Sequence, residues 1–486
     1  MKFKMFLFFP VFLYILLNYF CSIATEKASL TEIRFGSDTE KTRLAFDLSK
    51  KVSYTICRQG NPDIFIIEFP GTEMKKNIKK IYKPDDNLIE EITFEKTAYD
   101  SVITTIKLKY NLPSENYKAF NMENPDRLVF DFYKNFDEKS VTYLSESVIW
   151  ARIRKGSWKG VISFNVVIAD LERENINLKA IQAKDNNKSR ETTSSMAQRT
   201  GALVAVNGGY YNKDGGPLGL VIIDGILQSP HVAKRPPRTA LGVRYDKKIL
   251  IDRIKAVNDR VISLSGKDWT RVIYAIGAGP NLITDGKINI TAKEEELGPG
   301  GNDVTRRAGH TALGITKDNK LVLFSVDDRK SKSTESLGMN LTEIAEYLLK
   351  LNVTDAINMD GGDSTTMVIE GKLISETYSP ERKVANCWSL FDTGNSGIAP
   401  ASINVNQTGY NNLTYSLDIT VTDGAGNPVP DGTGVRINSS YGVPKPSFTV
   451  TKNGKASIKF ASMKAGAAGL YVTAGTVNQE FNLSFQ

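Results

Sequence analysis

The residue types best suited to chemistry are concentrated in the segment 356–367. There a short apolar strand leads into Asp360, and two glycines separate it from Asp363 and from the hydroxyls of Ser364 and Thr365. Glycine permits positive φ angles and lets a ligand approach the backbone closely, so this order of residues suits a small-molecule site at a strand end. The plainer alternative is a Gly-Gly turn that joins two strands.

Several other polar clusters in the same part of the chain also follow apolar strands. They include Asn207-Gly208-Gly209, Arg238, the segment 277–282, Arg307 within 306–314, and Asp327-Asp328-Arg329. A sheet presents the residues at its strand ends to a neighbouring cleft. The number of such clusters therefore favours a functional site over a single tight turn.

In their order along the chain, these clusters resemble the phosphodiester glycosidase family over about residues 147–393. The animal member of that family removes N-acetylglucosamine from a sugar phosphodiester. The resemblance therefore implies hydrolysis of a sugar 1-phosphodiester at its glycosidic bond. The family usually has a third glycine where this chain has Asp363, so no family role can be transferred to that carboxylate.

The chemistry of this bond requires few groups. A phosphate monoester is a good leaving group, so one carboxylate can suffice, either as a base for water or as a nucleophile, where ordinary glycosidases use two. We assign that role to Asp360. Asp328 is predicted to orient Asp360 or a water, and Asp363 is a third candidate for the catalytic set.

A cation must also bind the phosphate, and arginine offers two parallel donors for this task. The predicted substrate-binding residues are Asn207, Gly208, Arg238, Arg307, Arg329, Gly361, Gly362, Ser364 and Thr365. A structural interpretation stays open for several of them. The arginines could be ordinary exposed side chains, Asn207 a strand cap, and the Gly208-Gly209 step a tight turn.

A metal site is a further hypothesis, and no cofactor is assigned with certainty. The side chains that would suit Ca²⁺ or Mg²⁺, if they converge, are those of Asp327, Asp328, Asp360 and Asp363. His231 and His310 are the only histidines, which argues against zinc. His310 is either a residue that touches substrate or a buried structural imidazole.

The central region, 141–395, must position these residues, and we predict an α+β domain built on a mixed sheet. The segment 341–351 has its apolar residues on one helical face, with Asn340 as N-cap and Glu343 three residues later. A second helix is expected over 193–199. It leads into the apolar strand that ends before Asn207.

The regions on either side are predicted to be β-sandwiches. Residues 28–135 contain two copies of a three-strand unit, each with an Asn-Pro-Asp turn before its last strand, and resemble the AMIN domain of bacterial cell-envelope proteins. Residues 400–486 alternate apolar and polar residues between turn-rich connections and resemble bacterial immunoglobulin-like repeats. We expect these flanking domains to bind peptidoglycan or an anionic wall polymer.

The whole chain has features of an exported multidomain protein. Its 486 residues exceed the size of a single core. Residues 1–24 combine two lysines, an apolar run and small residues, which predicts a signal peptide, with an uncleaved anchor as the alternative. The net charge of +8 and pI of about 9.0 favour polyanionic partners, and the lack of a basic block with interleaved aromatics argues against nucleic acid.

The sequence therefore predicts a secreted or cell-envelope bacterial hydrolase. Its substrate would be a carbohydrate phosphodiester in envelope or extracellular glycans, cleaved at the glycosidic bond. Two alternatives stay open: a non-catalytic wall- or polysaccharide-binding protein, and a phosphodiesterase that cleaves the P–O bond.

Overall fold

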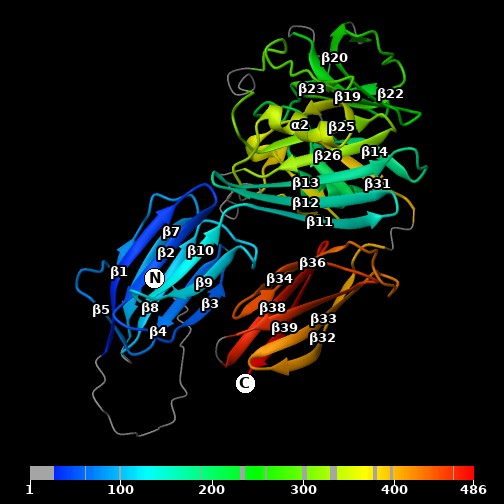
Figure 1. The fold of residues 1–486 in the computed structure, drawn as a ribbon. Coiled ribbons are helices and arrows are strands. Elements are labelled where there is room, and N and C mark those ends of the chain that lie inside the picture. The colour runs from blue at the N-terminus through cyan, green and yellow to red at the C-terminus, as the bar shows by residue number, and fades with distance from the viewer. Residues whose placement is uncertain are drawn as a thin grey trace, which may run out of the picture.

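A computed structural model describes residues 27–486, apart from 61, 98–99, 187, 230–235, 258–259, 298–303, 329–335, 376–379, 395–397 and 463–464. The predicted signal peptide, His231 and Arg329 lie outside the described residues. The chain forms three bodies of mostly β structure, with the central one drawn uppermost in Figure 1. Within the described ranges, no helix is long and apolar enough to cross a membrane.

The N-terminal region consists of two five-stranded sheets around one hydrophobic core. Their orders are β5-β1-β2-β10-β9 and β3-β4-β8-β7-β6. The strands are β1 (Ala28–Ser37), β2 (Lys41–Leu48), β3 (Thr55–Gln59), β4 (Ile64–Phe69), β5 (Thr72–Met74), β6 (Ile81–Tyr82), β7 (Ile89–Lys96), β8 (Val102–Leu108), β9 (Tyr117–Met122) and β10 (Arg127–Tyr133). Each copy of the repeat has four strands, β1–β4 and β7–β10, so the predicted three-strand unit is one strand short. Each sheet combines the first two strands of one copy with the last two strands of the other.

An eight-stranded sheet supports the central region, in the order β11-β12-β13-β26-β25-β27-β23-β24. Its strands are β11 (Phe136–Ser145), β12 (Val148–Ser157), β13 (Gly160–Asp170), β23 (Asn281–Thr284), β24 (Lys287–Ile288), β25 (His310–Thr316), β26 (Lys320–Val326) and β27 (Val353–Asn358). Every neighbouring pair in this sheet is antiparallel, so the prediction of a mixed sheet is wrong. The helix between β26 and β27 does make those two strands parallel to each other, but β25 lies between them.

Both α-helices of the described part belong to the central region. Helix α2 (Leu341–Lys350) has the predicted capping box, in which Glu343 N donates to Asn340 Oδ1 at 2.8 Å and Asn340 N donates to Glu343 Oε2 at 2.9 Å. Helix α1 (Thr193–Thr200) also lies where it was predicted. Both helix predictions are confirmed.

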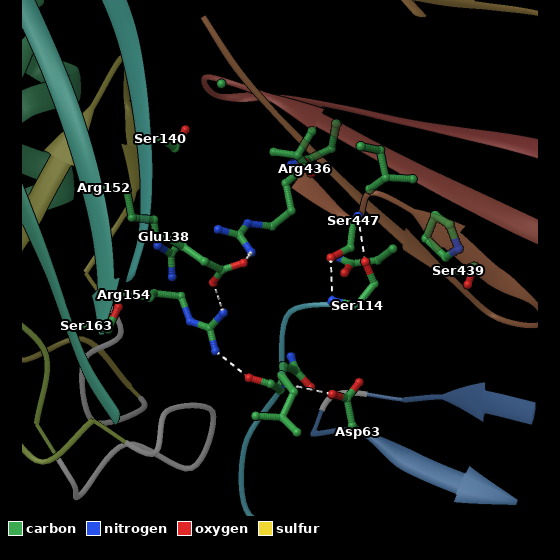
Figure 2. A pocket seen from close by; sticks show the side chains of 18 of the residues that line it. Asp63, Ser114, Glu138, Ser140, Arg152, Arg154, Ser163, Arg436, Ser439 and Ser447 are labelled. Atoms are coloured by element: carbon green, nitrogen blue, oxygen red, sulfur yellow. Dashed lines mark hydrogen bonds and ion pairs between the residues drawn. The ribbon is translucent and has the colours of Figure 1, made fainter. Parts of the chain in front are cut away.

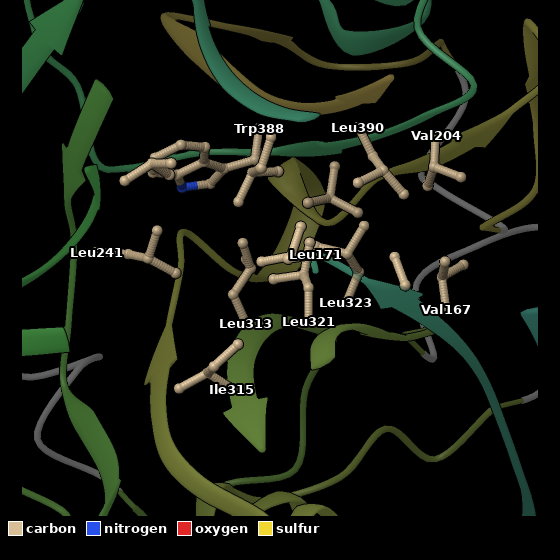
Figure 3. Close-up of a cluster of buried hydrophobic side chains, with 14 of the residues drawn as sticks. Val167, Leu171, Val204, Leu241, Leu313, Ile315, Leu321, Leu323, Trp388 and Leu390 are labelled. Atoms are coloured by element: carbon tan, nitrogen blue, oxygen red, sulfur yellow. The ribbon is translucent and has the colours of Figure 1, made fainter. Parts of the chain in front are cut away.

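Two more antiparallel sheets complete the central region, in the orders β14-β31-β16-β28-β29 and β18-β17-β22-β19-β20-β21, with a small β15-β30 ladder. Their strands are β14 (Ile176–Gln182), β15 (Glu191–Thr192), β16 (Val204–Asn207), β17 (Val221–Ile223), β18 (Ile226–Leu227), β19 (Arg238–Arg244), β20 (Ile249–Val257), β21 (Arg260–Ser263), β22 (Val272–Gly277), β28 (Met367–Ile369), β29 (Lys372–Leu373), β30 (Lys383–Val384) and β31 (Asn386–Asp392). One buried cluster joins all three large sheets, with Leu313, Trp388 and Leu241 each contributed by a different one (Figure 3). This shared core fixes the strand ends relative to one another.

The C-terminal region has two four-stranded sheets, β32-β33-β37-β35 and β36-β34-β38-β39, around a separate core. The strands are β32 (Ser402–Asn411), β33 (Thr414–Thr422), β34 (Gly434–Ser439), β35 (Val443–Lys445), β36 (Phe448–Val450), β37 (Lys455–Ala461), β38 (Gly466–Ala474) and β39 (Val477–Phe485). Along β33, every second residue is buried. This is the period expected of a strand with one face on a core.

Candidate active site

Asp360 lies just beyond the end of β27, and the protein fixes its backbone from a distant part of the chain. Asp360 N donates to Gly208 O at 3.0 Å, and Asp360 O accepts from Asn207 Nδ2 at 2.7 Å. The carboxylate accepts a hydrogen bond from the Ser364 side chain. The structure thus brings together the two strand-end segments that the sequence analysis singled out.

The surroundings of the Asp360 carboxyl disfavour its charged form. Burial raises its pKa from the ordinary 3.8 to about 6, and the nearby charge of Asp363 adds to this effect. Hydrogen bonds from Ser364 and the Gly361 N–H, together with the positive charge of Arg382, act in the opposite direction without cancelling it. A carboxyl group with this pKa can exchange a proton near neutral pH, as general acid–base catalysis requires.

The two glycines after Asp360 are needed for different reasons. Gly362 has φ of +59°, in the left-handed region that favours glycine. At Gly361 a Cβ atom would stand 2.8 Å from Gly309 O and 3.2 Å from His310 Nδ1. The resulting turn enters the short 3₁₀ helix η3 (Gly362–Ser364), which brings the Ser364 side chain back to Asp360.

Close packing accounts for the other Gly-Gly step. A Cβ atom on Gly208 would lie 2.1 Å from Asn386 Oδ1, and one on Gly209 would lie 2.3 Å from Gly277 O. Gly209 N also donates to Asn386 Oδ1 at 2.9 Å. These contacts explain both glycines without a ligand.

The side chain of Asn207 is fully buried and engaged with protein groups. Its Oδ1 accepts from Thr311 Oγ1 at 2.6 Å and from Thr366 N at 3.0 Å, while its Nδ2 donates to Asp360 O. Asn207 therefore connects β16, β25 and the segment after Asp360. This geometry suits a residue that positions Asp360, whereas the predicted contact with substrate finds no support in it.

The predicted arginines lie in different surroundings. Arg307 donates to Gly338 O at 3.1 Å and forms an ion pair with Glu343 at the start of α2. Arg238 donates to Glu296 O at 3.3 Å and is close enough to Tyr210 to lower the pKa of that phenol. Only Arg238 of these two is thus linked electrostatically to the surroundings of Asp360.

Arg382 is a cation of this site that the sequence analysis missed. Its Nη1 lies 3.4 Å from Asp363 Oδ2, its Nε donates to Tyr211 OH at 3.0 Å, and its charge acts on Asp360. Half of the Arg382 side chain is exposed, so the guanidinium remains accessible to a ligand. Arg382 belongs to none of the strand-end clusters, and nothing in its local sequence distinguishes it from other arginines.

Several polar atoms beside Asp360 are buried without a hydrogen bond to any described residue. They are both ring nitrogens of His310, Asn358 Oδ1 and Thr365 Oγ1. Burial lowers the pKa of His310 to about 4, and neither the adjacent Asn358 side chain nor the charge of Asp328 offsets this effect. The imidazole is therefore neutral at neutral pH. Ordered water or a polar ligand can satisfy groups of this kind.

Tyr210 and Glu295 support the backbone around Gly279, and the sequence analysis assigned no role to either of them. Tyr210 OH donates to Gly279 O at 2.9 Å, and burial raises the pKa of the phenol. Glu295 is fully buried and accepts from Thr239 N at 2.8 Å and from Asn281 N at 3.0 Å, so it fixes the turn that contains Gly279. Its position within a Lys-Glu-Glu-Glu run suggests a solvated loop, which hid this role.

The four aspartates considered for a metal occupy different environments. Asp327 is buried, and Asp328 lies close to Gly309, where a Cβ atom would be 3.1 Å from Asp328 Cβ. In the part of the chain that the structure describes, no three His, Cys, Asp or Glu side chains come together as metal ligands. Among the described residues, the four aspartates therefore do not form a cluster of three metal-ligating side chains.

Comparisons with known families agree with this arrangement of regions. Residues 200–391 match the family model of phosphodiester glycosidases, and residues 32–132 match that of the AMIN domain. Residues 200–391 are therefore similar to a phosphodiester glycosidase domain, and residues 32–132 to an AMIN domain.

The curated relatives resemble this chain over its central region. N-acetylglucosamine-1-phosphodiester alpha-N-acetylglucosaminidase of Mus musculus is 32% identical over 208 residues, which make up 41% of this chain and 38% of the mouse protein. The SPbeta prophage-derived uncharacterized protein YomE of Bacillus subtilis is 27% identical over 187 residues, or 38% of this chain and 27% of that protein. The chain thus spans about two fifths or less of the length of these relatives.

A solved structure whose name states the same activity also resembles this chain. It is the catalytic domain of the zebrafish N-acetylglucosamine-1-phosphodiester alpha-N-acetylglucosaminidase, auto-inhibited by its pro-peptide. The TM-score is 0.41 at 23% identity, and the match covers 53% of this chain and 88% of that chain.

Proposed function

We propose that this protein hydrolyses the glycosidic bond of a sugar 1-phosphodiester in a cell-envelope or extracellular glycan. The observation that carries the proposal is Asp360, a carboxyl group at the end of β27 whose pKa burial raises to about 6. It lies inside the segment that matches the phosphodiester glycosidase family. The relatives whose names state this activity support the choice of bond.

Asp360 acts in its ionised form, which dominates above pH 6. As a base it removes a proton from water, the water oxygen bonds to sugar C1, and the C1–O bond breaks with its electron pair passing to the phosphate. As a nucleophile it bonds to C1 itself, and water hydrolyses the glycosyl ester in a second step. In either case the phosphate monoester leaves as an anion, so a general acid is not required.

The other residues of the site bind or orient. Arg382 neutralises the departing phosphate through its exposed guanidinium, and Arg238 is a second candidate for this task. Ser364 and Asn207 hold Asp360 in place. Asp328 orients the reacting water, and Asp363 aligns Arg382.

The flanking domains are proposed to keep the enzyme outside the cell at peptidoglycan or an anionic wall polymer. The resemblance of the first flank to the AMIN domain supports this role, as does the net charge of +8. Binding of the full chain to isolated cell walls should weaken as salt is raised from 50 to about 500 mM, because screening shortens the range of charge attraction. Binding that does not respond to salt would contradict an electrostatic contribution.

Hydrolysis of a panel of sugar 1-phosphodiesters in ¹⁸O-labelled water tests the proposal. The label is expected on the C1 hydroxyl of the released sugar. Label in the phosphate would instead identify a phosphodiesterase that cleaves the P–O bond. Binding of the panel without turnover would favour a non-catalytic envelope protein.

A further inference from the structure

A cavity of about 440 Å³ lies where the three regions of the chain meet (Figure 2). The N-terminal region contributes Arg58 and Ser114, strands β11 and β12 contribute Glu138 and Arg154, and the C-terminal region contributes Arg436. None of the residues assigned to the candidate active site lines it. We call it the junction cavity.

Cationic side chains outnumber acidic ones around the junction cavity. Five cations and two carboxylates line it, which leaves an excess of three positive charges. They are Arg58, Arg152, Arg154, Lys372 and Arg436, and Asp63 and Glu138. Walls of low dielectric strengthen the attraction of such an excess for an anion.

Glu138 is the acidic centre of the cavity and is shared between regions. It forms an ion pair with Arg154 from the neighbouring strand, and Arg436 Nη1 of the C-terminal region lies 3.4 Å from Glu138 Oε1. The Glu138 side chain is only 7% exposed. A single buried carboxylate therefore faces two guanidinium groups.

Arg436 is in an environment that disfavours its positive charge. Burial lowers its pKa to about 10, Glu138 counteracts this effect, and the charges of Arg154 and Arg152 lower the pKa further. A second anion beside these three arginines would relieve their mutual repulsion. Planar guanidinium groups are also well shaped to hold phosphate or carboxylate oxygens.

The rest of the lining is rich in hydroxyl groups from all three regions. The serines are Ser114, Ser140, Ser163, Ser336, Ser439 and Ser447. Ser114 N donates to Ser447 Oγ at 3.0 Å, and Ser447 N donates to Ser114 Oγ at 3.1 Å, which joins the first and last regions. Ser163 Oγ is buried with no hydrogen bond to a described residue. Such a lining can pair with the hydroxyls of a sugar.

We propose that the junction cavity is a second ligand site, which binds an anionic saccharide with its phosphate or carboxylate group on Arg152, Arg154 and Arg436. The sugar hydroxyls face the serines. Because all three regions line the cavity, an occupied site also ties the flanking domains to the central one. This site is separate from Asp360 and does not depend on the proposed hydrolysis.

Calorimetric titration of the full chain at low salt with glucose 6-phosphate, glucuronic acid, inorganic phosphate and glucose tests the proposal. We expect binding of glucose 6-phosphate or glucuronic acid, and the comparison of the two shows which anion is preferred. Glucose should bind at least tenfold more weakly, since it lacks the charge. Absence of binding by both charged sugars, or equal binding of glucose, would overturn the proposal.

Substitutions of arginines inside and outside the junction cavity test whether the ligand binds there. Arg436→Gln and Arg152→Gln should each weaken binding about tenfold or more, whereas Arg271→Gln, which removes an exposed arginine outside the cavity, should not. Arg152→Gln provides the same test if Arg436→Gln does not fold. Binding that survives both substitutions but is lost in Arg382→Gln would place the ligand at the candidate active site and exclude the junction cavity.

Discussion

The N-terminal region holds a buried aspartate and the candidate active site a partly exposed one, and the two surroundings favour opposite protonation states. In the N-terminal region, Asp131 accepts from Arg43 Nε and Nη2, each at 2.6 Å, and these hydrogen bonds hold its pKa below the usual range. Among the described residues, Asp360 receives hydrogen bonds from a hydroxyl and a backbone N–H and none from an arginine, and burial raises its pKa to about 6. The comparison teaches that burial of an acid does not mark function unless its charge is left poorly compensated.

The same contrast has opposite consequences for stability. A lowered folded pKa means that the ionised Asp131 stabilises the native state above its unfolded pKa, and that this contribution is lost as pH falls through the folded value. A raised folded pKa means that Asp360 costs stability as pH rises from 3.8 towards about 6, because the unfolded chain releases the proton first. Above that range the full cost is present.

Substitution of the two aspartates should give the largest difference in activity. Asp360→Asn removes the base or nucleophile without a change in size, so kcat should fall by on the order of 10³ or more. Asp131→Asn, the matched control, should leave kcat unchanged because it lies in another domain. Steady-state kinetics on a sugar 1-phosphodiester measures both. An Asp360→Asn protein that keeps a tenth or more of the original kcat would contradict the assignment of Asp360 as base or nucleophile.

The same pair of variants should differ in stability, with opposite signs. At pH 8, Asp360→Asn should raise the free energy of unfolding by up to roughly 3 kcal/mol, which corresponds to the difference between pKa 3.8 and about 6. Asp131→Asn should lower it by roughly 1 to 3 kcal/mol, because charged hydrogen bonds to Arg43 are lost. Urea unfolding measures these values. The gain for Asp360→Asn should shrink at pH 4, and a gain of equal size at both pH values would point to another cause.

Substitution of Arg382 should have a smaller effect on activity than substitution of Asp360. Arg382→Lys retains the charge and loses the planar fork, so kcat/KM should fall about tenfold. Arg307→Lys should have a weaker effect, because the ion pair with Glu343 directs Arg307 towards α2. If Arg307→Lys lowered kcat/KM more than Arg382→Lys did, phosphate binding would be assigned to Arg307, as the sequence predicted.

Asp363→Gly should have the smallest effect and restores the glycine usual in the family. The Asp363 side chain is 39% exposed and lies at 3.4 Å from Arg382, so its removal should change kcat/KM by less than about threefold. A loss as large as that of Asp360→Asn would instead indicate a catalytic pair of carboxylates.

Local sequence patterns predicted the parts of the site that depend on neighbouring residues. The Gly361-Gly362 turn and the capping box of α2 arise from residues close together in the chain, so their types and spacing were sufficient. The sequence also placed Asn207 and Asp360 at strand ends, but it could not show that the two meet, because β16 and β27 belong to different sheets. The role of Asn207 could not be predicted either, since its partners Thr311 and Thr366 come from other segments.

Features that depend on contacts between distant segments could not be predicted from local sequence patterns. Arg382 reaches Asp363 from a loop with no recognisable pattern, and Glu295 looks like part of a solvated charge run although it is fully buried. The mixed sheet was predicted from a strand-helix-strand pattern. In the structure, β25 lies between β26 and β27 and pairs antiparallel with both of them. Local patterns show where strands end and not which strands become neighbours.

The pH dependence of kcat/KM tests most directly whether the poorly compensated Asp360 carboxylate performs the reaction. We predict an acid limb with an apparent pKa of about 6, below which activity falls tenfold per pH unit as the carboxylate takes up a proton. His310 does not account for this limb, because burial lowers its pKa to about 4, well below the value of about 6 for Asp360. A constant kcat/KM between pH 4.5 and 7.5, or activity that rises as pH falls, would contradict the account.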